Sequence, residues 1–202
     1  MRFIKENSEF VRRLFTFQIG IAIFSIAVNL AVNHAWGGQY LIWVSLFAIL
    51  FYGYLLYTAA WEQGSKDIVR MEAGRLERSS WVGLKSALIA DIPNAILCLL
   101  LFIGTLLQNI SANLFTIVLF IDGFLWGSMY YGIVWSVAVT PIVTPTGIVA
   151  ETNAWLVTLC YFISLFVLPL VCHVGYVLGQ KNLRLFRRSA PNSSTSPSKN
   201  QK

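Results

Sequence analysis

The chain has 202 residues, of which 56% are hydrophobic and only 12% are Asp, Glu, Lys or Arg. Soluble domains carry about twice that share of charged residues, so the composition excludes a water-soluble globule. Because lipid cannot hydrogen-bond the backbone, such a chain must form helices or a closed barrel. Its apolar runs are long and continuous rather than alternating, and we therefore expect an all-α, polytopic transmembrane helix bundle.

Positive charge is confined to three segments, and this distribution predicts the topology. The net charge is +6, and all 15 Lys and Arg residues lie within 1–13, 66–85 and 181–202. Basic segments next to membrane spans stay on the cytoplasmic side. We therefore expect a multi-pass protein of the bacterial cytoplasmic membrane with both termini in the cytoplasm. We expect it to contact the bilayer and its anionic lipid head groups. We expect no nucleic-acid partner.

The apolar runs predict the membrane spans in chain order. The first three spans and the last one are expected at residues 14–32, 41–60, 84–107 and 154–178. Between the third and the last lies an apolar run over 114–150, which is too long for one span of about 20 residues.

This run must leave the basic tail on the cytoplasmic side, and it can do so in two ways. We prefer about six membrane segments, in which the region contributes crossings at about 112–127 and 131–150. Four full crossings plus a re-entrant segment satisfy the same charge rule, and five segments are a further alternative. The spans form one domain over 1–180, and the Ser, Pro and Asn content of 181–202 predicts a disordered cytoplasmic tail.

The charged segment 61–85 joins the second and third spans. Glu62 and Lys66 are four residues apart in the order that supports a helix, and Gly74 is placed to end it. Ser79 or Ser80 can cap the helix that follows. We interpret the segment as a cytoplasmic amphipathic elbow. Its candidate contacts with lipid or with a cytosolic protein are Lys66, Asp67, Arg70, Arg75 and Arg78.

The elbow contains the pattern W-x-x-G-x-K-D-x-x-R-x-x-x-G-R over 61–75, followed by "GLKSALIADIPN". The later stretches "SMYYGI" and "GYVLGQKN" extend the similarity. Together they resemble small, uncharacterised polytopic membrane proteins of Gram-positive anaerobes. The resemblance implies the helical membrane architecture, and it implies no activity.

Two ionisable residues lie inside the predicted spans. Asp91 lies in "IADIPN", where Pro93 kinks the helix and Asn94 shares a face with Asp91, and Asp122 lies in "LFIDGF". A carboxyl at membrane depth costs about 2.5–3.5 kcal/mol on insertion scales, so it should face protein or water. We consider Asp91, Asn94 and Asp122 as a transport site or polar relay. The alternative for Asp91 is a structural pair with a basic residue such as Lys85.

The remaining polar groups of the spans predict packing rather than chemistry. Asn29 and Asn33 are four residues apart and are expected to hydrogen-bond another helix. Cys98, Cys160 and Cys172 lie in apolar runs without a CxxC pair, so we expect neither a disulfide nor a metal site. The chain has no HExxH, GxSxG or Walker sequence, and we expect no enzyme, no catalytic residue and no cofactor.

Two functions fit this description. Because the loops are too short for an extramembrane domain, we expect first a non-enzymatic accessory or partner-binding component of a transport, export or immunity system. The alternative is a small, oligomeric transporter or channel that uses Asp91 and Asp122. The partner would be a membrane or cytosolic protein in the first case and a second copy of the chain in the other.

Overall fold

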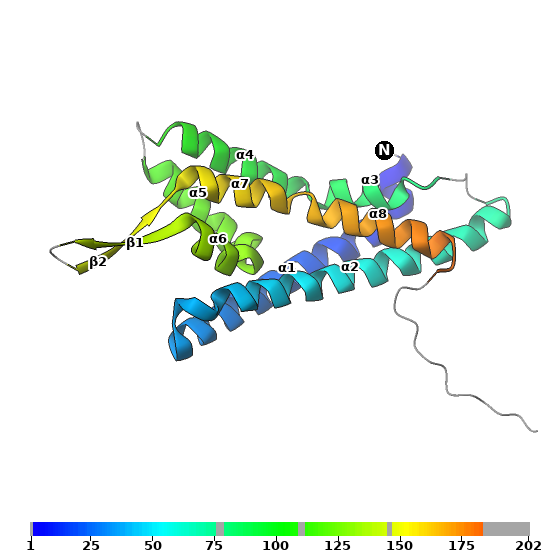
Figure 1. Cartoon of the computed structure of the whole chain (residues 1–202). Helices are drawn as coiled ribbons and strands as arrows, with labels where there is room; N and C mark the ends of the chain where they lie inside the picture. The colour runs from blue at the N-terminus through cyan, green and yellow to red at the C-terminus, as the bar shows by residue number, and fades with distance from the viewer. Residues whose placement is uncertain (1, 76–78, 109–111, 145–146, 184–202) are drawn as a thin grey trace, which may run out of the picture.

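The computed structural model describes residues 2–75, 79–108, 112–144 and 147–183. The described chain is mostly helical, and its helices pack into an elongated bundle (Figure 1). The elements in chain order are α1 (Arg2–Trp36), the 3₁₀ helix η1 (Gly38–Tyr40), α2 (Leu41–Glu72), α3 (Val82–Ala90), α4 (Ile92–Leu106), α5 (Ala112–Leu125), the 3₁₀ helix η2 (Gly127–Tyr130), α6 (Tyr131–Ala138), β1 (Val139–Thr144), β2 (Gly147–Thr152), α7 (Ala154–Ser164) and α8 (Val167–Gln180).

The helices are those of a membrane protein. In the described chain, three helical segments are long and apolar enough to cross a bilayer: Glu6–Trp36, Gly38–Glu72 and Ala154–Gln180. Two further pairs qualify only when joined across a bend, which is 54° between α3 and α4 and 93° between α5 and α6. The all-α membrane prediction therefore agrees with the structure, with three to five candidate spans.

The predicted helical crossing over 131–150 is wrong. Helix α6 ends at Ala138, and the chain then forms an antiparallel hairpin in which Val139 of β1 lies opposite Thr152 of β2. Val, Ile and Thr favour strands, and Pro141 cannot donate the backbone hydrogen bond that a continuing helix needs. The described chain therefore contains at most five helical spans rather than six.

Helices α5 and α6 double back on themselves. In Figure 1, α5 starts and α6 finishes at the end of the bundle that holds the β-hairpin, and η2 makes the turn inside the bundle. The N-terminus, the end of α2 and the end of α8 lie at the opposite end (Figure 1). Both ends of the α5–α6 segment therefore lie at the same end of the molecule.

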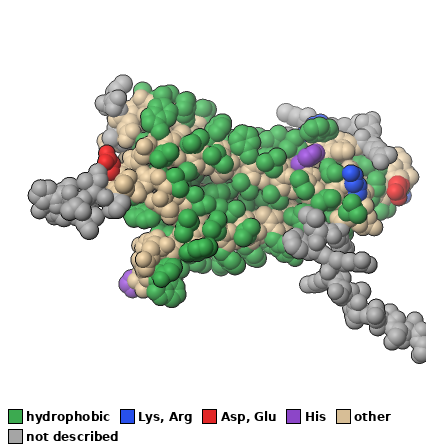
Figure 2. Space-filling model, in the orientation of Figure 1, with side chains coloured by type: hydrophobic (Ala, Val, Ile, Leu, Met, Phe, Trp, Pro, Cys, Tyr) green, Lys and Arg blue, Asp and Glu red, His purple; other side chains and the backbone are tan. Residues whose placement is uncertain are grey.

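The core consists of two clusters of buried side chains. One lies among α1, α2, α3 and α8 and includes Leu14, Leu56 and Tyr176. The other lies among α4, α5, α6 and α7 and includes Leu101 and Val157. Outside these clusters the surface stays apolar over the middle of the bundle, and the Lys, Arg, Asp and Glu side chains visible in Figure 2 lie toward its two ends. An apolar girdle of this kind suits a lipid surrounding.

The predicted elbow is only partly a separate element. Helix α2 continues without a break from the apolar span to Glu72, so the first half of the elbow extends that helix. Gly74 has a φ of 69° and follows directly after the helix end, as its sequence position predicted. The predicted serine cap is wrong, because Trp81 is the N-cap of α3, and Ser79 Oγ only accepts a 3.4 Å bond from Trp81 N.

Candidate membrane-embedded polar site

Asp91 occupies the break between α3 and α4. It is both the C-cap of α3 and the N-cap of α4, and Pro93 lies in the first turn of α4. Proline is tolerated at this position because its missing N–H has no helical partner there. The resulting 54° bend places the Asp91 side chain inside the bundle, where it is 5% exposed. The predicted kink at "DIPN" is therefore confirmed.

Two amide groups hold the Asp91 carboxyl. Gln18 Nε2 on α1 and Asn94 Nδ2 on α4 each donate a 3.1 Å hydrogen bond to Asp91 Oδ1. The shared face of Asp91 and Asn94 agrees with their spacing in the sequence. Lys85 lies on the exposed side of α3 with its Nζ 5.9 Å from the Phe3 ring. Amides from two helices thus bind the Asp91 carboxyl.

Gln18 was not predicted as a residue of this site. Its side chain is 2% exposed and comes from the first predicted span, far from Asp91 in the chain. The signal was present, because Gln18 is a lone amide within an apolar run, and polar residues in spans face the bundle interior.

Asp122 lies in α5, one residue before Gly123, and its side chain is fully buried. Neither carboxyl oxygen has a hydrogen-bond partner among the described residues. An ionised carboxylate that is buried without partners costs far more free energy than a neutral one. The Asp122 carboxyl therefore needs a proton, or a bound cation, to remain in this position.

Cys98 connects the surroundings of the two aspartates. Its thiol lies within electrostatic range of both Asp91 and Asp122. Cys98 Sγ also lies 4.0 Å from Asn94 Oδ1 and 3.6 Å from the carbonyl oxygen of Tyr161 on α7. Asp91, Asn94 and Asp122 are thus all buried, and the Cys98 thiol interacts electrostatically with both carboxyl groups.

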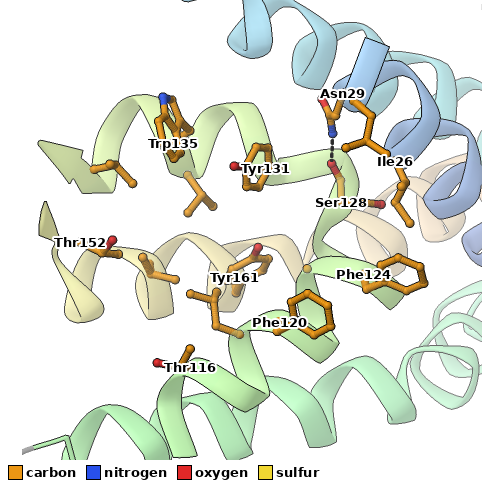
Figure 3. Close-up of a pocket in the computed structure, with 16 residues that line it drawn as sticks. Ile26, Asn29, Thr116, Phe120, Phe124, Ser128, Tyr131, Trp135, Thr152 and Tyr161 are labelled. Carbon is orange, nitrogen blue, oxygen red and sulfur yellow. Dashed lines mark hydrogen bonds between the residues drawn. The ribbon is translucent and has the colours of Figure 1, made fainter. Parts of the chain in front are cut away.

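A pocket of about 470 Å³ lies among α1, α5, α6 and α7 (Figure 3). We call it the α5–α6 pocket. Its lining includes Gly123, which follows Asp122 directly. Five aromatic side chains contribute to its walls: Phe120, Phe124, Tyr131, Trp135 and Tyr161.

The turn at η2 forms one side of this pocket and is fixed to α1. Asn29 Nδ2 donates a 2.7 Å bond to the Ser128 carbonyl oxygen (Figure 3). Ser128 Oγ donates a 3.0 Å bond to the Ala22 carbonyl oxygen. The prediction that Asn29 bonds another helical segment is confirmed. Asn29 Oδ1 has no hydrogen-bond partner among the described residues, although the residue is only 7% exposed.

A glycine sets the distance between η2 and α7. A Cβ atom on Gly127 would overlap the ring of Tyr161, which also lines the pocket. Tyr161 lies within electrostatic range of Asp122. The ring therefore packs against the turn of the α5–α6 segment.

The predicted cytoplasmic contacts have different surroundings. Lys66 is exposed and binds Glu62 at 2.8 Å, and Arg13 of α1 binds the same carboxylate at 2.7 Å. Arg70 and Arg75 are also exposed, whereas Arg78 lies outside the described residues.

Asp67 differs from these residues because it is only 2% exposed. Tyr176 Oη of α8 donates a 3.0 Å bond to Asp67 Oδ2, and Gln63 Nε2 donates a 3.0 Å bond to Asp67 Oδ1. Asp67 thus joins α2 to α8 and is not displayed on the surface.

No group of three or more His, Cys, Asp or Glu side chains in the described chain is placed to hold a metal ion. Comparison with known proteins gives no matching family model, no similar curated protein and no similar solved structure. The function must therefore be argued from the geometry of Asp91, Asp122 and the α5–α6 pocket.

Proposed function

We propose that the protein is a small transporter of the bacterial cytoplasmic membrane in which Asp122 and Asp91 bind protons or cations. The observation that supports this most is the fully buried Asp122 carboxyl, which has no hydrogen-bond partner among the described residues. Ionisable groups in membrane interiors are rare and mark ion and substrate pathways. A carboxyl with a purely structural role would be expected to have hydrogen-bond donors around it.

The interrupted helices support the same proposal. The chain breaks at Asp91 between α3 and α4, and again at η2 between α5 and α6. Transporters place discontinuous helices at their binding sites, because the ends of half-helices offer unpaired backbone groups and dipoles. Here both breaks lie next to the buried carboxyl region, so substrate or ion binding there can change how the half-helices pack.

The proposed topology has four full crossings and one re-entrant segment. The four elements that would each cross the membrane are α1, α2, the α3–α4 pair and the α7–α8 pair. The α5–α6 segment would enter and leave the membrane on the outer side. This arrangement keeps the basic segments 1–13, 66–85 and 181–202 in the cytoplasm. It is supported by the 93° bend between α5 and α6 and by their return to one end of the bundle.

Asp91 and Asp122 would have different roles. The two amide bonds from Gln18 and Asn94 fix the position of the Asp91 carboxyl, so this group orients a proton or cation. Asp122 has no such bonds and is the group that exchanges its ligand during transport. Cys98, within electrostatic range of both, lies along the route between them.

A partner-binding role is the second candidate. It is favoured by the exposed Lys66, Arg70 and Arg75 at the end of α2, which are available to a cytosolic protein or to anionic lipid. This role predicts that charge reversal at Arg70 and Arg75 disrupts co-purification of a partner, while Asp91→Asn has no effect. Transport predicts the reverse.

The transport proposal is tested by proton and cation flux into proteoliposomes that contain the full chain. Imposed H⁺, Na⁺ and K⁺ gradients should dissipate faster with the wild-type protein than without it for at least one of these ions. Asp122→Asn should remove that flux, and Asp91→Asn should reduce it strongly. Glu151→Gln is the matched control, because it neutralises an exposed carboxyl at the end of β2. Wild-type flux that persists in Asp122→Asn would reject the proposal.

A further inference from the structure

The apolar part of the chain contains acidic residues but no Lys or Arg. No Lys or Arg occurs over 14–65 or over 86–180, whereas Asp91 and Asp122 both lie in the buried region between the helices. Charges in a low-dielectric interior act over longer distances than in water. The interior around α4, α5 and α7 therefore favours positively charged molecules and disfavours anions.

The α5–α6 pocket has the lining that an organic cation requires. Its size lies within the range of small-molecule sites. The faces of Trp, Tyr and Phe rings attract cations, and Trp135, Tyr131 and Phe120 all contribute to the lining. The unpartnered polar atom in its lining residue Asn29, Oδ1, is an acceptor and can accept a hydrogen bond from an ammonium group.

The buried Asp122 carboxyl is not part of the pocket lining, but two lining residues relate the pocket to it. Gly123 in its lining is the chain neighbour of Asp122, and the ring of Tyr161 lies within electrostatic range of that carboxyl. Figure 3 shows Tyr161 projecting from α7 between the two arms of the α5–α6 segment. A cation in the pocket would therefore be attracted to an ionised Asp122 without having to reach it.

Access to the pocket is from the surface that faces lipid. Two lining residues on α5 and one on α1 are among the large apolar side chains most exposed on the bundle: Phe120, Phe124 and Leu30. A molecule that already dissolves in the bilayer can reach the pocket between these side chains. A small hydrated ion has no comparable reason to enter there.

We infer that the α5–α6 pocket binds a lipophilic organic cation of drug-like size, with its apolar body against the aromatic walls and its positive charge facing Asp122. This substrate class rests on the proposed transport function. It requires no covalent step, since recognition depends on shape, ring faces and charge.

The test compares two probes of the same shape and opposite charge, tetraphenylphosphonium and tetraphenylborate. Binding is measured by equilibrium dialysis against the full-length protein in detergent, with protein-free micelles subtracted. The inference predicts saturable binding of tetraphenylphosphonium and no saturable binding of tetraphenylborate. Asp122→Asn should weaken the binding of tetraphenylphosphonium by about tenfold, which corresponds to about 1.4 kcal/mol.

Phe124→Ala tests the pocket itself and has a closely matched control. Phe124 is 58% exposed and stacks on Phe120, whereas Phe47 on α2 is 59% exposed, stacks on Phe51 and lies outside the described pocket lining. Phe124→Ala should weaken tetraphenylphosphonium binding roughly threefold to tenfold, and Phe47→Ala should leave it unchanged. Size-exclusion profiles equal to wild type show that each variant is folded.

Equal binding of both probes, or equal effects of Phe124→Ala and Phe47→Ala, would overturn the inference. Because this assay measures binding and not flux, its failure leaves the proton and cation flux through Asp122 as a separate result. Absence of flux with the wild-type protein, together with saturable cation binding, would in turn reject the transport role and retain the binding site.

Discussion

Gln18 Nε2 on α1 donates a 3.1 Å hydrogen bond to Asp91 Oδ1, at the break between α3 and α4. The bond joins the first helix of the chain to the point where the third apolar segment bends. Both side chains are buried, so water does not substitute for either partner.

Gln18→Leu is expected to destabilise the folded bundle by about 1–2 kcal/mol, because Asp91 then loses one of its two amide donors. The measurement is the free energy of unfolding in detergent, with Thr16→Ala as control. Thr16 is exposed on the same helix, and its Oγ1 donates a 2.9 Å bond to the Arg12 carbonyl oxygen of that helix. Equal losses in the two variants would show that the Gln18 contact contributes nothing specific.

Tyr176→Phe should destabilise the packing of α2 on α8 by about 1–3 kcal/mol. The change removes only the hydroxyl that donates to the buried Asp67 carboxylate. The measurement is again unfolding in detergent, and Tyr40→Phe, which removes a hydroxyl from an exposed ring, should be neutral within error. A neutral Tyr176→Phe would mean that Asp67 is hydrated or paired by Gln63 and Arg70 alone.

Two glycines of α2 should respond to alanine in opposite directions. A Cβ atom on Gly64 would overlap the Tyr176 carbonyl oxygen, whereas a Cβ atom on Gly53 meets nothing within 4 Å. Gly64→Ala should lower the melting temperature, with a cost of roughly 1–3 kcal/mol from overpacking. Gly53→Ala should raise the melting temperature, because alanine favours the helix over glycine by up to about 1 kcal/mol. Tolerance of Gly64→Ala would contradict the close approach of α2 and α8.

The two buried carboxyl groups should differ in their reaction with N,N′-dicyclohexylcarbodiimide, which modifies protonated carboxyls in apolar surroundings. Asp122 has no hydrogen-bond partner among the described residues, while Asp91 accepts two bonds. Mass spectrometry of the labelled protein should find modification at Asp122 first, increasing as the pH falls. Preferential labelling of Asp91 would show that Asp122 is ionised and paired in the membrane.

Local features of the sequence were sufficient for part of this structure. The spacing of Asp91 and Asn94 placed both on one face, and Gly74 marked the end of α2, because each depends only on residues within one turn. The apolar composition likewise identified a helical membrane protein, since lipid requires backbone groups to be paired within the segment.

The contacts of Gln18 and Asp67 depended on the tertiary fold. Their partners lie 73 and 109 residues away in the chain, and an apolar run in lipid shows no polar face from which such packing could be inferred. The hairpin over 139–152 was missed for a related reason. Its Val and Ile residues are as apolar as those of a span, and we gave this apolar character more weight than their preference for strands.

The central claim is that α5–α6 enters and leaves the membrane on one side, which places Asp122 inside without a full crossing. The most direct measurement is labelling of single cysteines by a membrane-impermeant maleimide, after Cys98, Cys160 and Cys172 are replaced by alanine. Probes at Asn113→Cys and Thr152→Cys flank the segment, and Ser65→Cys marks the end of α2. The account predicts that the first two label from outside and Ser65→Cys only from inside. Labelling of Asn113→Cys and Thr152→Cys from opposite sides would show that the segment crosses, and would contradict it.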